Sequence, residues 1–195
     1  MNKRKILWSA VAVLTFVLIG FICLTRINFL DYEKPIPYGR IDEITFKNFR
    51  GMEFFQKSLY GNKSFAYIYT SIEYEFEDDS LSIQSFFHPS RSYVYNKKAY
   101  SKDLLRHELY HFRITELYAR IAKKRIAALN APTESEIEDL ITVIKKQEDN
   151  YQRAYDDDTF HSYVLSKQKK YEKDVDSLLS LYGNYSKPKI FINEQ

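Results

Sequence analysis

The hydrophobic period of the chain changes at Ser101, and this change constrains the fold more than any other feature of the sequence. Before Ser101, in residues 64–77, apolar and polar residues alternate, which is typical of a half-buried strand. After Ser101, apolar residues recur every three to four positions, as on one face of an amphipathic helix. A run of strands followed by a run of helices predicts an α+β domain.

Short segments with strand character are separated by turn-forming residues in the first half of the chain. The segments are 44–49, 64–77, 81–87 and 92–96. Asp78, Asp79 and Ser80 predict a turn between the second and third segments. We therefore expect a small, mostly antiparallel sheet of about three to five strands.

Three helices are expected after the sheet. Their ranges are about 102–129, from 134 to about 155, and about 163–182. Ser101 is a typical N-cap residue, and Pro132 ends the first helix. Thr133 and Glu136 have the spacing of a capping box, and Gly183 is a typical helix stop.

Residues 1–25 differ in composition from the rest of the chain. Nineteen residues from Ile6 to Leu24 carry no charge, which is close to the roughly 20 that cross a bilayer as a helix. Basic residues 3–5 precede them, so the positive-inside rule predicts a cytoplasmic N-terminus and an extracytoplasmic chain beyond. We expect a cytoplasmic stub and a single-pass transmembrane signal anchor in the cell membrane. A cleaved or lipidated leader is the alternative.

The rest of the chain is expected to consist of a linker and one extracytoplasmic domain. Residues 26–42 mix charges, two prolines and a glycine without a period, which indicates a linker. Residues 43–195 are long enough for one domain with its own core. Within them, the end of the chain, 183–195, contains an apolar triplet, and both a docking strand and a frayed tail remain open.

Composition excludes several classes of partner and site. Lys plus Arg number 29 against 26 Asp plus Glu, and no basic block lies beyond the N-terminus, so nucleic acid is not expected as a partner. The only cysteine, Cys23, lies in the apolar stretch. The domain therefore has no thiol for a disulfide, a zinc knuckle or a nucleophile, and a metal would need nitrogen and oxygen ligands.

The segment LLRHELYHFRITELYARIAKK, residues 104–124, contains two histidines one helical turn apart. His107 and His111 project from the same side of a helix, and Glu108 lies beside them. Zinc peptidases use this arrangement, with two imidazoles on the metal and a carboxylate as general base. The histidines fall on the apolar stripe, where an unpaired polar cluster would cost several kcal/mol. The pattern favours a Zn²⁺ site over a buried histidine cluster.

A zinc site needs a third protein ligand, and helix geometry favours His161. Glu116 lies about 180° around the helix from His107. If the first two helices are antiparallel, the level of His107 is met near residue 155 or 156 on the second. His161 follows a few residues later, so we predict it as the third ligand in preference to His88.

The same turn supplies two further candidates. The hydroxyl of Tyr155 can donate to a developing oxyanion. The carboxylate of Asp156 can accept a hydrogen bond from the second nitrogen of a ligand histidine. Asp157 is interpreted as part of a solvated helix end.

Taken together, these motifs resemble those of a bacterial family of predicted secreted zinc-dependent proteases. The resemblance covers most of residues 43–182. It rests on an aromatic-x-x-Phe-x-Gly segment, an aromatic strand and two longer motifs. The matching residues are Phe46 to Gly51, Ser92-Tyr93-Val94, His107, Glu108, His111, Phe112, Ile114, Glu116, Tyr118, Ala119, Arg120, Tyr155, Asp156, Thr159, His161 and the helix around Gln168.

The resemblance implies a zincin-like fold and metallopeptidase activity, but the chain departs from the family pattern at two places. Leu109-Tyr110 replaces the usual Gln-Gly, which is expected to put a bulky ring near the metal-bearing face. Ser162 replaces the glycine that follows the last histidine.

Two functions fit these features. The first is a membrane-anchored zinc hydrolase, preferably a peptidase, that acts on a peptide or protein lying along the sheet edge. The second is a non-catalytic envelope protein whose metal is structural and whose sheet binds a partner. The sequence gives no indication of oligomeric state.

Overall fold

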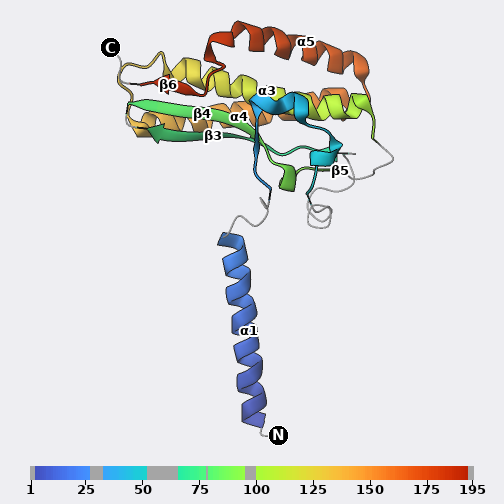
Figure 1. Ribbon diagram of the computed structural model, residues 1–195, viewed down its shortest axis with the longest axis vertical. Coiled ribbons are helices and arrows are strands. Elements are labelled where there is room, and N and C mark those ends of the chain that lie inside the picture. Colours follow the sequence, from blue (N-terminus) through green and yellow to red (C-terminus); the bar gives the residue numbers. More distant parts are fainter. Residues whose placement is uncertain (1–2, 27–32, 52–65, 78, 95–99, 193–195) are drawn as a thin grey trace. The chain divides into compact units, whose positions relative to one another are not determined.

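The computed structural model describes residues 3–26, 33–51, 66–77, 79–94 and 100–192, which fall into two units, 1–32 and 33–195 (Figure 1). The described residues of the first unit form helix α1 (Lys3–Arg26). In these described ranges no helix has both the length and the hydropathy that a bilayer span requires, so the predicted membrane span is not supported. The residues interpreted as a linker, 26–42, are divided between the units.

The described residues of the second unit form two antiparallel sheets. In the larger, β3 (Thr70–Glu77) pairs along the whole of β4 (Ser80–Phe87). The opposite edge of β4 pairs with β1 (Ile36–Pro37) at one end and with β6 (Lys189–Phe191) at the other. The smaller sheet joins β2 (Ala66–Tyr67) to β5 (Tyr93–Val94). The antiparallel prediction is confirmed, and β6 shows that residues 189–191 form a docking strand.

The prediction of a strand over residues 44–49 is wrong. Phe46–Asn48 form a short 3-10 helix, because the hydroxyl of Thr45 accepts from the Lys47 amide and the Asn48 side chain accepts from the Thr45 amide. Gly51 closes this segment by donating its amide to the Ser92 carbonyl at 2.7 Å. A Cβ at Gly51 would lie 2.8 Å from that oxygen, so the close approach requires glycine.

The three predicted helices are present, and the predicted caps begin two of them. They are α3 (Lys102–Ile126), α4 (Glu134–Thr159) and α5 (Leu165–Leu181). The hydroxyl of Ser101 accepts from the Leu104 amide at 3.0 Å. Thr133 and Glu136 form the reciprocal capping box. Helix α4 continues four residues beyond the predicted end at Tyr155, and this extension brings Asp156 into a regular helical position.

The elements stack in three layers (Figure 1). Helices α3 and α4 pack on one face of the larger sheet, where strand and helix side chains share a core. This core contains Ile72, Leu81, Ile83, Ala119, Ala122, Ile126, Ile137, Ile141 and Ile144. Helix α5 covers the other side of α3 and α4 through a second core, formed by Ile114, Leu117, Tyr155, Val175 and Leu179. Helix α3 is therefore held on opposite sides, which fixes the direction of its side chains.

One polar network also ties α3 to the sheet. The carboxylate of Glu116 is buried and accepts from Arg120 at 2.7 Å and from the Ser85 hydroxyl at 2.7 Å. Arg120 also donates to the Leu179 carbonyl at 2.8 Å. Glu116 thus takes part in packing, away from the two histidines of the same helix.

Candidate metal site

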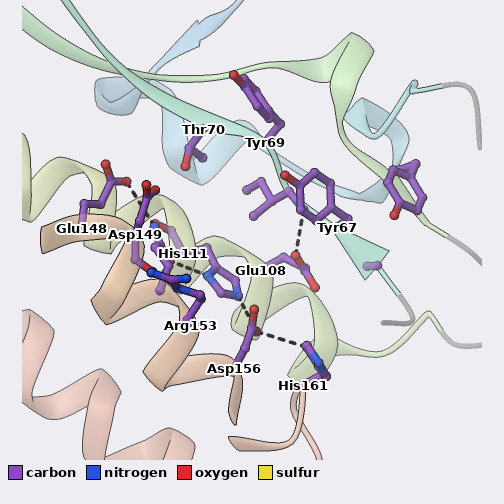
Figure 2. Close-up of a pocket in the computed structure, with 14 residues that line it drawn as sticks. Tyr67, Tyr69, Thr70, Glu108, His111, Glu148, Asp149, Arg153, Asp156 and His161 are labelled. Atoms are coloured by element: carbon purple, nitrogen blue, oxygen red, sulfur yellow. Dashed lines mark hydrogen bonds and ion pairs between the residues drawn. The ribbon is translucent and has the colours of Figure 1, made fainter. Parts of the chain in front are cut away.

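Three histidine nitrogens converge on one oxygen of Asp156. The Nε2 atoms of His107 and His111 lie 3.1 and 3.0 Å from Asp156 Oδ1, and Nδ1 of His161 lies 3.2 Å from it. Figure 2 shows His111 on α3 and His161 beyond the end of α4 both facing this carboxylate. The antiparallel packing of α3 and α4 thus brings residues 107 and 156 to the same level, as the sequence predicted.

The separation of the two α3 histidines equals that of two ligands that share one tetrahedral ion. Two atoms that each lie about 2.0–2.1 Å from such an ion are about 3.3 Å apart. The Nε2 atoms of His107 and His111 are 3.3 Å apart. The candidate ligand atoms of His107, Asp156 and His161 all lie within 4.8 Å of one another. His107, Asp156 and His161 could therefore hold a small ion that prefers nitrogen and oxygen ligands, and His111 lies beside them.

The ionisation states of the clustered residues leave a negative charge on the Asp156 carboxylate. Burial lowers the pKa of His107 to about 4, so this ring is neutral at pH 7. Burial also disfavours a charge on His111, but the charge and hydrogen bond of Asp156, the charge of Glu108 and the hydrogen bond of Gln152 together outweigh burial and raise the pKa of His111 to about 9. Burial opposes ionisation of Asp156, yet the charge of His111 and the histidine hydrogen bonds hold its pKa well below the usual range. An arriving cation would meet an ionised carboxylate and would need to displace the proton of His111.

Gln152 fixes the orientation of His111, and the sequence did not reveal this role. Its Nε2 donates to the His111 carbonyl at 2.9 Å, so its Oε1 is the atom that faces His111 Nδ1 at 2.5 Å. The ring must therefore carry a proton on Nδ1, which leaves the lone pair of Nε2 free for a cation once the second proton is lost.

A signal for Gln152 exists in the pattern of α4. The buried stripe of this helix passes through Ile137, Ile141 and Ile144 and continues through Glu148. Gln152 follows four residues later and also donates to Glu148 at 3.3 Å. Polar residues that continue an apolar stripe indicate a buried network, because unpaired polar groups are seldom buried.

Glu108 lies on the wall of a cavity beside this cluster. It is only 4 % exposed, and its Oε2 accepts from the Ile68 amide at 3.0 Å. Burial raises the pKa of Glu108 to about 7. A carboxyl group with a pKa near neutrality can both accept and return a proton.

The cavity has a volume of about 730 Å³ and lies between the strand segment and α4. The wall formed by residues 66–70 is rich in tyrosine, whereas the α4 wall, residues 148–156, carries polar and charged side chains (Figure 2). Glu108, His111, Asp156 and His161 line it together. A cleft of this size, with convergent polar groups at one place, is typical of a ligand site.

Two predicted features occupy different positions from those expected. Tyr155 is fully buried, and its ring stacks on His107 with centroids 4.6 Å apart. Tyr155 packs against the histidine and does not line the cavity, so the structure does not favour the oxyanion role. Tyr110 donates to Asp176 of α5 at 2.8 Å and does not line the cavity, so the bulky ring expected near the metal-bearing face points toward α5.

The turn that carries His161 has an unusual backbone. Phe160, His161 and Ser162 have φ angles of 52°, 51° and 80°. Three successive non-glycine residues in the left-handed region each cost about 1–2 kcal/mol. The turn is nevertheless well bonded, because the amides of His161 and Val164 donate to the carbonyls of Asp156 and Thr159. Conformational energy is thus stored where the chain points His161 at Asp156.

Ser162→Gly is expected to stabilise the metal-free protein by about 0.5–1 kcal/mol. Glycine adopts φ near 80° without steric cost, and this gain exceeds the added entropy of the unfolded chain. Urea unfolding of the two proteins measures the difference. Ser166→Gly, at an exposed position inside α5, is the control and should destabilise, since φ there is negative and helical. A loss of stability in Ser162→Gly would contradict the strain argument.

Residues 91–162 match a bacterial family of unknown function (DUF922). The match begins just before β5 and ends one residue after His161, so it contains all four side chains of the cluster and Glu108. No curated protein and no solved structure matches the chain. A functional interpretation therefore depends on the geometry of the site.

Proposed function

We propose that this chain is a zinc-dependent hydrolase and that its substrates are peptides or proteins. The observation that supports the proposal most is the convergence of three imidazole nitrogens on the Asp156 carboxylate at separations of 3.0–3.2 Å. The buried carboxyl of Glu108 lies on the same cavity wall.

The residues present divide into ligands and a proton carrier. His107, His111, His161 and Asp156 would hold the ion, which supplies Lewis acidity to a water molecule and to a carbonyl group when bound. Glu108 takes the proton of the attacking water and returns it to the leaving amine. The hydrogen bond from Ile68 holds the carboxyl group toward the cavity, and the strand wall offers an extended peptide a surface to lie on.

The same cluster contains the observation that favours the alternative, a non-catalytic protein with a structural metal. Asp156 adds a fourth donor, and structural zinc sites have four protein ligands, whereas catalytic sites keep one position open. For hydrolysis, the three histidines would hold the ion and Asp156 would leave one position open for water.

Location outside the cytoplasm is a separate proposal that rests on the sequence alone. Basic residues 3–5 precede the uncharged stretch 6–24, and this order favours export of the following domain. Alkaline phosphatase fused after residue 195 should be active in a bacterial host, and an inactive fusion at normal expression would contradict the proposal.

The decisive test of the hydrolase proposal combines metal content with turnover. We expect the full chain, reconstituted with zinc and desalted, to bind about one zinc per chain by plasma emission and to cleave unfolded casein. The double variant His107→Ala/His111→Ala should bind none. Absence of zinc from the wild type would rule out the hydrolase. Stoichiometric zinc in a wild type that cleaves nothing, together with no gain of cleavage in Asp156→Ala, would instead favour the structural alternative.

A further inference from the structure

Three buried side-chain atoms in the described part of the chain have no hydrogen-bond partner. They are Nδ1 of His107, the hydroxyl of Tyr155 and Oε1 of Gln168. These residues are 1 %, 0 % and 2 % exposed. Buried polar atoms are almost always paired, and each unpaired one costs about 1–3 kcal/mol. Three such atoms indicate a missing partner.

The three residues come from α3, α4 and α5, which pack against one another. The Tyr155 ring stacks on the His107 ring. Tyr155 lies four residues before the end of α4, and Gln168 lies three residues after the start of α5, so antiparallel packing brings them to nearly the same level. Gln168 donates to Glu172 at 2.9 Å. The ring of Tyr155 also contacts the ring of Tyr171, the residue before Glu172, with centroids 5.3 Å apart.

We propose that one buried water molecule lies among these three atoms and links His107 to Gln168, which makes Gln168 a positioning residue for the histidine. A buried water normally makes about three hydrogen bonds to otherwise unpaired groups, which is the number of atoms that need a partner here. Only the part that concerns metal affinity rests on the proposed function.

The chemistry of His107 explains why water suits this position better than a direct contact. In the metal-free protein, Nε2 of His107 contacts the Asp156 carboxylate at 3.1 Å and therefore carries the ring proton, so the unpartnered Nδ1 needs a donor. A ring whose Nε2 held an ion would carry its proton on Nδ1 and would need an acceptor there. The Gln168 carbonyl oxygen can only accept, whereas water can donate in the first state and accept in the second. In both states water donates to Gln168 and accepts from Tyr155.

His111 has no such requirement. Its Nδ1 donates directly to Gln152 Oε1, and this contact serves the ring both with and without an ion. The two ligand histidines of α3 are therefore oriented differently. Gln152 bonds His111 directly, whereas Gln168 bonds His107 through the water.

The test follows the His107 ring in the full chain labelled with ¹⁵N-histidine. We expect Gln168→Leu to shift the Nδ1 resonance of His107 in the metal-free protein and to weaken zinc binding about 10–100-fold in a chelator competition. Tyr155→Phe, which removes only the hydroxyl, should shift the same resonance. This variant tests the water site even if Gln168→Leu does not fold. Lys169→Leu, on the exposed side of α5, is the control and should change neither quantity.

The two proposals can fail separately. An unchanged Nδ1 resonance in Tyr155→Phe and in a folded Gln168→Leu would overturn the water site, whatever the zinc content. If the wild type binds no zinc while the resonance shifts as expected, the water site stands and the proposed hydrolase fails.

Discussion

Glu108→Gln is expected to lower peptide hydrolysis by about 10²–10⁴-fold while zinc remains bound. The amide cannot accept the proton of the attacking water, although it can still accept from the Ile68 amide that now bonds Glu108. Glu108 does not belong to the converging cluster, so its replacement removes no ligand. Initial rates and zinc content measured on the same preparation test this expectation. Turnover that survives the substitution would assign the proton transfer to another group.

The same substitution should stabilise the metal-free protein at neutral and alkaline pH. Burial raises the Glu108 pKa from 4.5 to about 7, so the native state holds its proton more tightly than the unfolded chain does. The contribution of Glu108 to stability is therefore unimpaired below pH 4.5 and is lost as the pH rises through about 7. Above that pH, the loss amounts to about 3 kcal/mol.

Urea unfolding in the presence of a chelator, from about pH 5 to 8.5, measures this effect. Glu108→Gln should approach the stability of the wild type at the acidic end and exceed it by up to about 3 kcal/mol at the alkaline end. Glu138→Gln, an exposed glutamate of α4, is the matched control and should show no such divergence. A difference between Glu108→Gln and the wild type that does not vary with pH would contradict the assignment.

Metal removal is the second change with a large expected effect. Zinc present at about 1,000 times its dissociation constant should stabilise the fold by about 4 kcal/mol, because the native state brings together ligands that are far apart in the unfolded chain. A chelator should abolish this increment. His161→Ala should lose most of it, since one of the three converging imidazoles disappears.

The increment is obtained for each protein as the difference between unfolding in zinc and unfolding in chelator, so any intrinsic cost of the substitution cancels. His88→Ala is the matched control. His88 is buried like His107, but its Nε2 contacts the Ser71 hydroxyl at 2.7 Å, away from the cluster. Its increment should equal that of the wild type. An undiminished increment in His161→Ala would remove this histidine from the ligand set.

Much of the fold was predictable because its signals are local. Caps such as Ser101 and Thr133 depend only on residues within one turn, and the helices begin where these caps indicate. The segment 44–49 failed because side-chain hydrogen bonds from Thr45 and Asn48 override its apolar alternation. Pairing of β1 and β6 with β4 joins distant parts of the chain and leaves no local signal.

The site residues also differ in whether local sequence signals predict their positions. Helix register was sufficient to bring His107 and His111 together and to place residue 156 at their level. The position of Asp156 among three imidazoles depends on how far α4 continues, which its composition did not reveal. The contact of Gln152 with His111 spans 41 positions and depends on the rotation of α4 about its own axis.

The two ends of the second unit pair with the same edge of β4, through β1 and β6. Each end therefore covers backbone groups that would otherwise form an open strand edge, and such edges promote association between chains. An expressed fragment that starts after Pro37 or stops before Lys189 would uncover part of this edge. Trimming either terminus to improve crystals should accordingly favour aggregation, although both ends are remote in sequence from the histidines of α3.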